Sequence, residues 1–166
     1  MRIRFSICAL LLCLCVAPLW ANAPAKAVAW QGKGADGGTV NFDPQHLQRP
    51  TLLLFWATWC PYCEALMPYL QKVYNAAGKK NLNVYAIDIK DGDGHPAAVL
   101  RQRKFTFTLV RDGDAIADAY GVEGTPGLFL VDTKGDIVYQ RSGSDEPAKV
   151  EAALRTKLHL GKARHK

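Results

Sequence analysis

The sequence is poor in cysteine, and the few cysteines are placed so that they exclude several kinds of site. Of five cysteines in the 166 residues, Cys8, Cys13 and Cys15 lie near the start, which leaves only Cys60 and Cys63 in the rest of the chain. No second cysteine pair and no His-x-His cluster accompanies them, so a zinc site with four protein ligands is not expected. We therefore interpret Cys60 and Cys63 as a redox pair and predict neither a metal site nor a cofactor.

The sequence also lacks an apolar run of the roughly 20 residues that a membrane-spanning helix needs. A shorter run, residues 5–16, follows a basic start and precedes an alanine-rich stretch. This pattern is typical of a secretory signal peptide, which we predict over residues 1–23, with cleavage between residues 21 and 27. It indicates a periplasmic protein. The alternative is an uncleaved segment that tethers the protein to a membrane.

There is little excess charge once that segment is removed. The whole chain carries 21 Lys and Arg against 15 Asp and Glu, and loss of Arg2, Arg4 and Lys26 would lower the net charge from +6 to +3. The remaining positive charge gathers near a basic tail at residues 159–166, so nucleic-acid binding is not expected. We expect one monomeric domain over residues 28–158, because about 140 residues suffice for a single core.

An apolar run leads directly into the cysteine pair and then into a helical pattern. Residues 51–56 are predicted to form a central strand covered on both faces. Pro61 suits the first position of a helix, and Gly78 suits its end. At the start of this helix the Cys60 thiol meets unpaired N–H groups and the positive end of the helix dipole, which favour the thiolate. We therefore predict Cys60 as the nucleophile and Cys63, one turn further on, as the resolving thiol.

Two motifs of the chain are similar to those of a known family. The first is Phe55-Trp-Ala-Thr-Trp-Cys-Pro-Tyr-Cys63, with Pro68 five residues later, and the second is Tyr120-Gly-Val-Glu-Gly-Thr-Pro-Gly-Leu-Phe-Leu-Val-Asp132. Together they resemble the thioredoxin superfamily and, within it, the exported TlpA-type branch. The resemblance implies that the Thr125–Pro126 peptide bond is cis and lies beside the cysteine pair, with the Thr125 backbone free to pair with a bound peptide.

The resemblance and the residue pattern predict an α/β, thioredoxin-like fold. This fold has a central mixed sheet flanked by helices, an N-terminal β-hairpin and an inserted helix. Strands are expected at residues 28–31, 39–42, 51–56, 82–89, 127–131 and 137–140, with an extended piece at 105–110. Helices are expected at residues 61–77, 96–104, 115–120 and 146–158, with a short helical turn at 43–47 and a capping turn at 112–114.

The predicted function is thiol-disulfide exchange, most simply the reduction of disulfides in client proteins. The Cys60 thiolate would attack the client, the mixed disulfide would be held against Thr125, and Cys63 would release the product. Further client-binding residues are predicted to be Trp59, Pro61, Tyr62 and Pro126. A membrane thiol-disulfide protein is the expected electron donor.

Two positions depart from the family pattern. Many cytosolic thioredoxins have a buried Asp at the position of Leu54, where it handles the proton of the resolving thiol. Glu123 or Glu64 could substitute for it, and we favour Glu123. Gly127 stands where the cytochrome-maturation members have Glu, which counts against a dedicated apocytochrome c role.

Other functions stay open at the level of the sequence. Pro61-Tyr62 resembles the central dipeptide of glutaredoxins, although the rest of the chain does not, and this dipeptide affects the redox potential. A disulfide oxidase or isomerase is therefore one alternative. A non-enzymatic Cu(I)-binding module is another, although the scarcity of Met and nearby His counts against it. The loop Asp91–Pro96 lacks the spacing of a calcium-binding loop.

Overall fold

The computed structural model describes residues 25–161 of the chain and contains a five-stranded mixed sheet. Its strand order is β5-β4-β3-β6-β7. The central strand β3 pairs in parallel with β4 and antiparallel with β6, while β5 and β7 form the two edges. The strands are β3 (Thr51–Trp56), β4 (Asn83–Asp88), β5 (Thr108–Val110), β6 (Gly127–Val131) and β7 (Ile137–Ser142).

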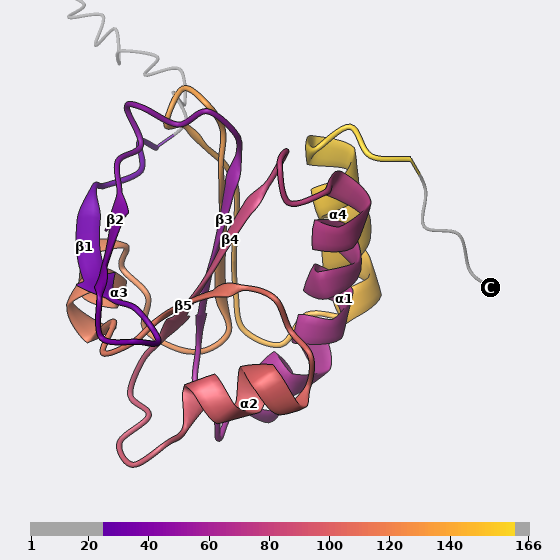
Figure 1. The fold of residues 1–166 in the computed structure, drawn as a ribbon. Coiled ribbons are helices and arrows are strands. Elements are labelled where there is room, and N and C mark those ends of the chain that lie inside the picture. Colours follow the sequence, from indigo (N-terminus) through magenta and orange to yellow (C-terminus); the bar gives the residue numbers. More distant parts are fainter. Residues whose placement is uncertain (1–24, 162–166) are drawn as a thin grey trace, which may run out of the picture.

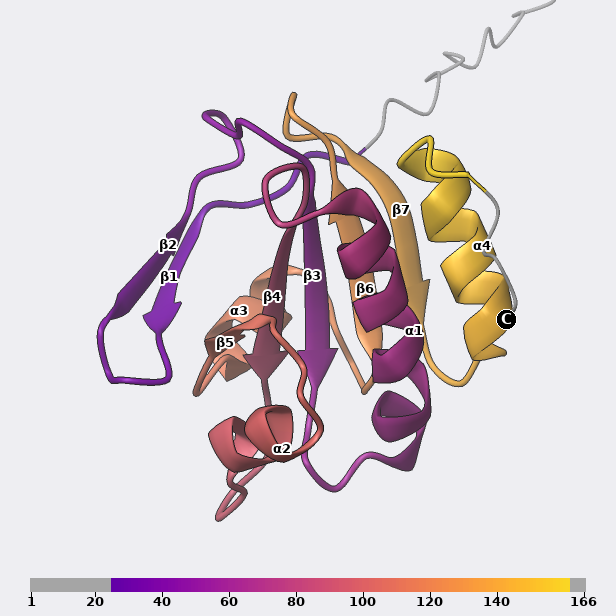
Figure 2. The same ribbon diagram turned by 45° about the vertical axis from the view of Figure 1, so that its right-hand side comes forward.

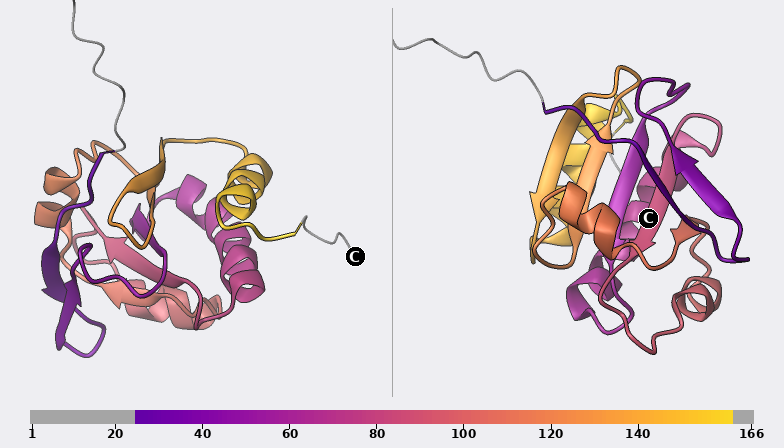
Figure 3. Two further views of the ribbon diagram at one scale, coloured as in Figure 1. Left: turned by 90° about the horizontal axis from the view of Figure 1, so that it is seen from above. Right: turned by 90° about the vertical axis from the view of Figure 1, so that its left-hand side faces the viewer.

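Both faces of the sheet are covered, which explains why every residue of β3 is buried (Figure 1). Helices α1 (Pro61–Ala77) and α4 (Pro147–Lys157) pack on one face. Helix α3 (Asp114–Ala119) and a separate hairpin of β1 (Trp30–Lys33) and β2 (Thr39–Phe42) lie on the other, as Figure 3 shows from two further sides. Side chains of β3 alternate between the two cores, as the pleat of a strand requires. The predicted thioredoxin-like fold, mixed sheet and N-terminal hairpin are confirmed.

The carboxyl ends of β3 and β4 meet at the same end of the molecule, because the two strands run in parallel. Helix α2 (Pro96–Gln102), the inserted helix, lies at this end with the start of α1 (Figure 2). In the strand register Trp56 lies beside Asp88, so the last residues of both strands are neighbours. This end of a parallel pair is where α/β proteins usually place their reactive groups.

The N-terminal hairpin is fixed to the sheet at several points. Trp30 stacks on Phe42 and meets the edge of Tyr85 on β4. The hydroxyl of Tyr120 donates to the carbonyl of Val28 at 2.8 Å and accepts from its amide at 3.1 Å. The hairpin also bridges Lys33 to Arg111 at the end of β5, where the Arg111 amide donates to the Lys33 carbonyl at 2.7 Å.

Some element boundaries differ from those predicted. Residues 43–47 form turns and bends, not helix, and a hydrogen bond from the Gln45 amide to the Asp43 carboxylate shapes the first of them. Helix α3 has Gly113 as its N-cap with no side-chain cap, because the Asp114 carboxylate accepts from the Lys90 amide instead. Strand β1 begins two residues later than expected, and only the last three residues of the piece at 105–110 form β5.

The described residues leave out both ends of the chain. The predicted signal peptide and the last five residues of the basic tail lie outside residues 25–161. Lys26 forms a bridge and an ion pair with Asp136, so the ordered contacts begin before the predicted domain start at residue 28. Within the described residues, every helix is too short or too polar to cross a membrane.

Candidate redox site

The two predicted redox cysteines form a disulfide at the start of α1. Cys60 is the N-cap of the helix and Cys63 lies one turn inside it, with their Cα atoms 5.3 Å apart. The Cys60 sulfur accepts a hydrogen bond from the Cys63 amide at 3.1 Å. Cys60 keeps 3% of its surface exposed whereas Cys63 has none. Both cysteines are therefore largely buried, and the small exposed surface of the pair belongs to Cys60.

The loop that carries Cys60 is held against the segment that follows β4. The Ile89 amide donates to the carbonyl of Trp56 at 2.9 Å, and the indole N–H of Trp59 donates to the carbonyl of Lys90 at 2.9 Å. One carboxylate oxygen of Asp91 accepts from both the amide and the hydroxyl of Thr58, at 2.9 and 2.6 Å. These bonds fix the backbone on the N-terminal side of the nucleophile.

The predicted client-binding residues lie around this loop. Trp59 and Tyr62 are 60% and 58% exposed, which is unusual for aromatic side chains, and Pro61 is exposed as well. The Thr125–Pro126 peptide bond is cis. Because Gly127 pairs with Phe55, this peptide bond lies next to the carboxyl end of β3, close in the fold to the loop of Cys60.

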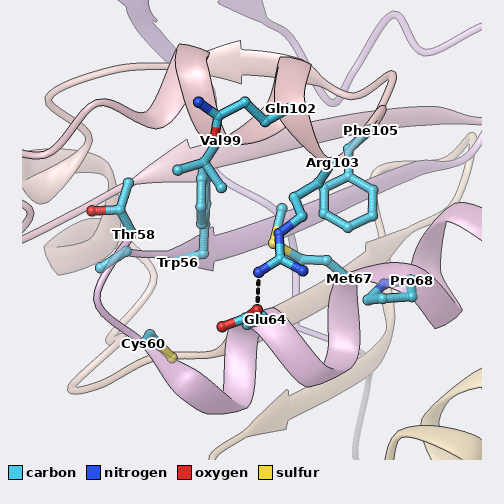
Figure 4. Close-up of a pocket in the computed structure, with 11 residues that line it drawn as sticks. Trp56, Thr58, Cys60, Glu64, Met67, Pro68, Val99, Gln102, Arg103 and Phe105 are labelled. Carbon is cyan, nitrogen blue, oxygen red and sulfur yellow. Dashed lines mark hydrogen bonds and ion pairs between the residues drawn. The ribbon is translucent and has the colours of Figure 1, made fainter.

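A cavity of about 170 Å³ opens beside Cys60 between α1 and α2 (Figure 4). Its walls combine polar and apolar side chains, and Arg103 at the end of α2 reaches across to form an ion pair with Glu64 on α1. A cavity of about 150 Å³ can hold a molecule the size of benzene, so one side chain of that size fits here. The lining residues are Trp56, Ala57, Thr58, Cys60, Glu64, Met67, Pro68, Val99, Gln102, Arg103 and Phe105.

The two glutamates predicted to handle protons are both exposed. Glu64 is engaged by Arg103 at the rim of the cavity. Glu123 is exposed, and its carbonyl oxygen lies 3.4 Å from the ammonium group of Lys90. Leu54 is fully buried in the core that faces α1, so the buried carboxyl of the cytosolic relatives has no counterpart at that position.

Sequence reasoning missed a buried carboxyl group on the neighbouring strand. Asp88, the last residue of β4, is 6% exposed. Burial raises the pKa of its carboxyl group to about 8, and a hydrogen bond to Asp91 and the charges of Asp91, Asp112 and Asp114 act in the same direction. The available signal was an acidic residue inside the apolar run Val84 to Ile89, paired in register with Trp56.

Residues 25–161 hold no group of three or more His, Cys, Asp or Glu side chains arranged to bind a metal ion.

Comparison with known proteins gives matches of three kinds. The profile of the AhpC/TSA family matches residues 23–140. The thiol-disulfide oxidoreductase ResA of Bacillus thuringiensis (strain Al Hakam) is 33% identical over 104 residues, which are 62% of this chain and 60% of that protein. ResA of Geobacillus thermodenitrificans is 33% identical over 86 residues, 51% of this chain and 49% of the relative. The chain thus matches about half to three fifths of the length of these curated relatives.

Solved structures match over more of their length. A Chlorobium tepidum chain assigned as thiol:disulfide interchange protein DsbE has a TM-score of 0.69 at 27% identity, covering 82% of this chain and 94% of that one. The thioredoxin domain of a thiol-disulfide oxidoreductase from Bacteroides vulgatus has a TM-score of 0.62 at 27% identity, with coverages of 80% and 98%.

Proposed function

Because the chain belongs to the AhpC/TSA family and has a thioredoxin-like fold, we propose that it is a thiol-disulfide oxidoreductase that works through Cys60 and Cys63. One observation carries the proposal: a disulfide spans the first turn of α1, with Cys60 lining a cavity and Cys63 fully buried. The names of the relatives and of the structural neighbours at 27% identity support the same reaction.

The reduced pair would act as a two-electron donor. The Cys60 thiolate is stabilised by the Cys63 amide and by the helix N-terminus, and it attacks one sulfur of a client disulfide. The other client sulfur leaves as a thiolate, and a mixed disulfide joins the client to Cys60. The Cys63 thiol loses its proton and attacks the Cys60 sulfur, so that the second client sulfur leaves and the Cys60–Cys63 bond forms.

The client would bind over the cysteine loop. Trp59, Pro61 and Tyr62 offer an exposed apolar rim, and the Thr125 backbone beside cis-Pro126 offers strand-like pairing. The cavity beside Cys60 would hold an apolar side chain close to the client cysteine. This arrangement suits extended or unfolded segments better than folded surfaces.

We propose further that the protein is an exported, monomeric reductase that receives electrons from a membrane thiol-disulfide protein. The N-terminal sequence pattern supports export to the periplasm. The direction of electron flow depends on the reduction potential of the pair, which separates a reductase from an oxidase.

The first experiment is to titrate the Cys60–Cys63 pair against glutathione buffers and follow tryptophan fluorescence, since Trp56 and Trp59 flank the loop. A potential at or below about −220 mV would support a reductase. A potential near −120 mV, typical of a strong oxidant, would refute the reductase direction and leave oxidoreductase activity in place.

A matched pair of variants tests the roles of the two thiols. We expect Cys63→Ala to accumulate mixed disulfides with client proteins, because the resolving thiol is missing, and Cys60→Ala to trap none. Non-reducing electrophoresis and mass spectrometry would detect the trapped species. The assignment is wrong if only Cys60→Ala traps clients.

A further inference from the structure

Two buried carboxylate oxygens close to the redox loop have no conventional hydrogen-bond donor among the described residues. They are Oδ1 of Asp88 and Oδ2 of Asp91. Asp88 ends β4, and Asp91 follows it in the loop that leads to α2. A charged group buried without a partner costs several kcal/mol in a protein interior, so each of these oxygens requires an explanation.

The two oxygens without a donor are accounted for if one of the two carboxyl groups carries a proton. A side-chain hydrogen bond with Asp91 is among the causes that raise the pKa of Asp88. Two ionised carboxylates are acceptors only, so such a contact needs one O–H donor. The surroundings favour retention of that proton, because burial raises the pKa of Asp88 to about 8 and nearby negative charges add to the effect. These surroundings favour one proton and one negative charge on the pair at neutral pH.

The charged groups around the pair come from two other segments. Asp112 and Asp114 lie between β5 and the first turn of α3. Asp112 forms an ion pair with Lys33, and Asp114 accepts from the amide of Lys90. The Lys90 ammonium is directed to the carbonyl of Glu123, so it does not neutralise the pair directly.

The pair is connected to the nucleophile through Thr58. The other Asp91 oxygen, Oδ1, accepts from the Thr58 amide and hydroxyl, at 2.9 and 2.6 Å. Thr58 lies two residues before Cys60 and lines the same cavity. On the other side, Asp88 lies in register with Trp56, which begins this loop. The pair is thus connected to the segment that precedes Cys60 at two points, Trp56 and Thr58.

We propose that Asp88 and Asp91 share one proton and together position the loop of Cys60, so that loss of this proton lowers the reactivity of the Cys60 thiolate. The proposal rests on the redox role proposed for Cys60 and adds two positioning residues to it. When the proton leaves, two adjacent carboxylates repel each other and Asp91 is pushed from its place under Thr58. The second negative charge also disfavours a thiolate nearby.

The shared proton is tested directly by infrared spectroscopy of the whole protein between pH 6 and pH 9.5. We expect a protonated carboxyl band at pH 7 that disappears as the pH rises through about 8, and we expect Asp88→Asn to lack it. This measurement does not depend on any redox activity. Absence of the band from the unmodified protein at pH 7 would overturn the proposal.

The positioning role is tested by alkylation of Cys60 with iodoacetamide in the reduced full chain that carries Cys63→Ala, read by mass spectrometry of the Cys60 peptide. At pH 7 we expect equal rates with and without Asp88→Asn, because the amide mimics the protonated carboxyl. At pH 9 we expect the chain that retains Asp88 to react at least about threefold more slowly than the Asn variant, because only the former gains the second negative charge. The control is Asp118→Asn, which removes an exposed charge on α3 that is not among the charges acting on Asp88 and should keep the unmodified pH profile.

A second pair of variants separates positioning from a general loss of folding. Asp91→Asn keeps an oxygen that can accept from Thr58, whereas Asp91→Ala does not. We expect slower alkylation at pH 7 for Asp91→Ala and recovery to within about twofold for Asp91→Asn. Identical pH profiles with and without Asp88→Asn, or no recovery by Asp91→Asn, would refute the positioning role. If client disulfides are not reduced but these effects on Cys60 remain, the proposed function fails and the carboxyl pair stands.

Discussion

At the scale of single residues, Gly127 shows how closely the backbone packs beside the redox site. A Cβ atom placed on Gly127 would lie 2.9 Å from Val122 Cγ1 and 3.4 Å from Phe55 Cβ. A larger side chain at this position, such as the Glu of the cytochrome-maturation members, therefore needs Val122 to move. The absence of a side chain is a packing requirement at the start of β6.

We predict that Gly127→Ala lowers the free energy of unfolding by about 1–3 kcal/mol, because the added methyl group overpacks the contact with Val122. Denaturant titration would measure the change. Gly124→Ala is the matched control, because a Cβ there meets no atom within 4 Å, and it should change stability by less than about 1 kcal/mol. Equal decreases in the free energy of unfolding for the two substitutions would contradict the packing explanation.

The residue scale is also where sequence reasoning reached its limit. Cys60 and Cys63 could be placed from their spacing and from the helix pattern that follows, because these signals are local. Glu123 and Glu64 were chosen for proton handling because they lie near the motifs in sequence. Asp88 lies 25 residues beyond Cys63, and only the parallel pairing of β3 with β4 brings it beside Trp56. The apolar run around Asp88 signals its burial, but its position beside Trp56 depends on strand pairing and could not be predicted from local pattern.

At the scale of elements, the inserted helix α2 forms one wall of the cavity beside Cys60. Arg103 spans from its end to Glu64 on α1, and both side chains are exposed to solvent. An exposed ion pair contributes at most about 1 kcal/mol to stability. The main contribution of Arg103 is therefore expected in client binding, where its aliphatic stem can cover an apolar side chain.

We predict that Arg103→Ala raises the KM for a protein disulfide such as that of insulin by roughly 3- to 10-fold, which corresponds to about 1 kcal/mol of lost contact. The rate with a small aliphatic disulfide, which carries no group that fills the cavity, should stay unchanged. Arg101→Ala is the control, because Arg101 lies on α2 away from this cavity. An equal loss of activity with both substrates would show that α2 supports the site in another way than by binding the client.

The hairpin β1–β2 is attached mainly through aromatic side chains and Tyr120. We predict that Tyr120→Phe lowers the free energy of unfolding by about 1 kcal/mol, because its hydroxyl both donates to and accepts from the backbone of Val28. Amide hydrogen exchange should become faster around residues 26–33 while β6 keeps its protection. Equally faster amide exchange over the whole sheet would mean that Tyr120 stabilises more than residues 26–33.

The pattern of elements was more predictable than their ends. Alternating and buried runs placed every strand of the sheet, because pleat and burial repeat over several residues. The helical turn expected at residues 43–47 is a single hydrogen-bonded turn, in which Asp43 also accepts from the Gln45 amide. The capping turn expected at residues 112–114 contains the N-cap Gly113 but supplies no side-chain cap, because Asp114 bonds to Lys90 in a distant segment, a contact that no local pattern contains.

At the scale of the whole molecule, Asp88 should make stability depend on pH. In the unfolded chain its carboxyl group titrates near its ordinary pKa of 3.8, while in the folded protein the pKa is about 8. Between these values the folded state binds more protons than the unfolded state. The contribution of Asp88 to the free energy of unfolding is therefore fully present below pH 4 and is lost as the pH rises to 8. Above pH 8 the loss should be complete.

We predict that the free energy of unfolding of the oxidised protein falls between pH 5 and pH 8 by on the order of a few kcal/mol more than that of Asp88→Asn. The amide cannot ionise, so the variant should be the more stable of the two at pH 8. Denaturant titrations of both proteins across this range would provide the comparison. Parallel curves would show that Asp88 does not keep its proton in the folded state.

The bridge between Lys33 and Arg111 has a consequence for association between molecules. An open sheet can recruit a further strand at each edge, and exposed edges are where chains aggregate. Here the hairpin covers the end of the short β5 edge with its own backbone, and the bridging residues are both basic. At the opposite edge β7 ends in the exposed and charged segment Gln140–Ser142. If clients bind beside cis-Pro126 as proposed, the two sheet borders would discourage those same segments from adding to the sheet as permanent strands.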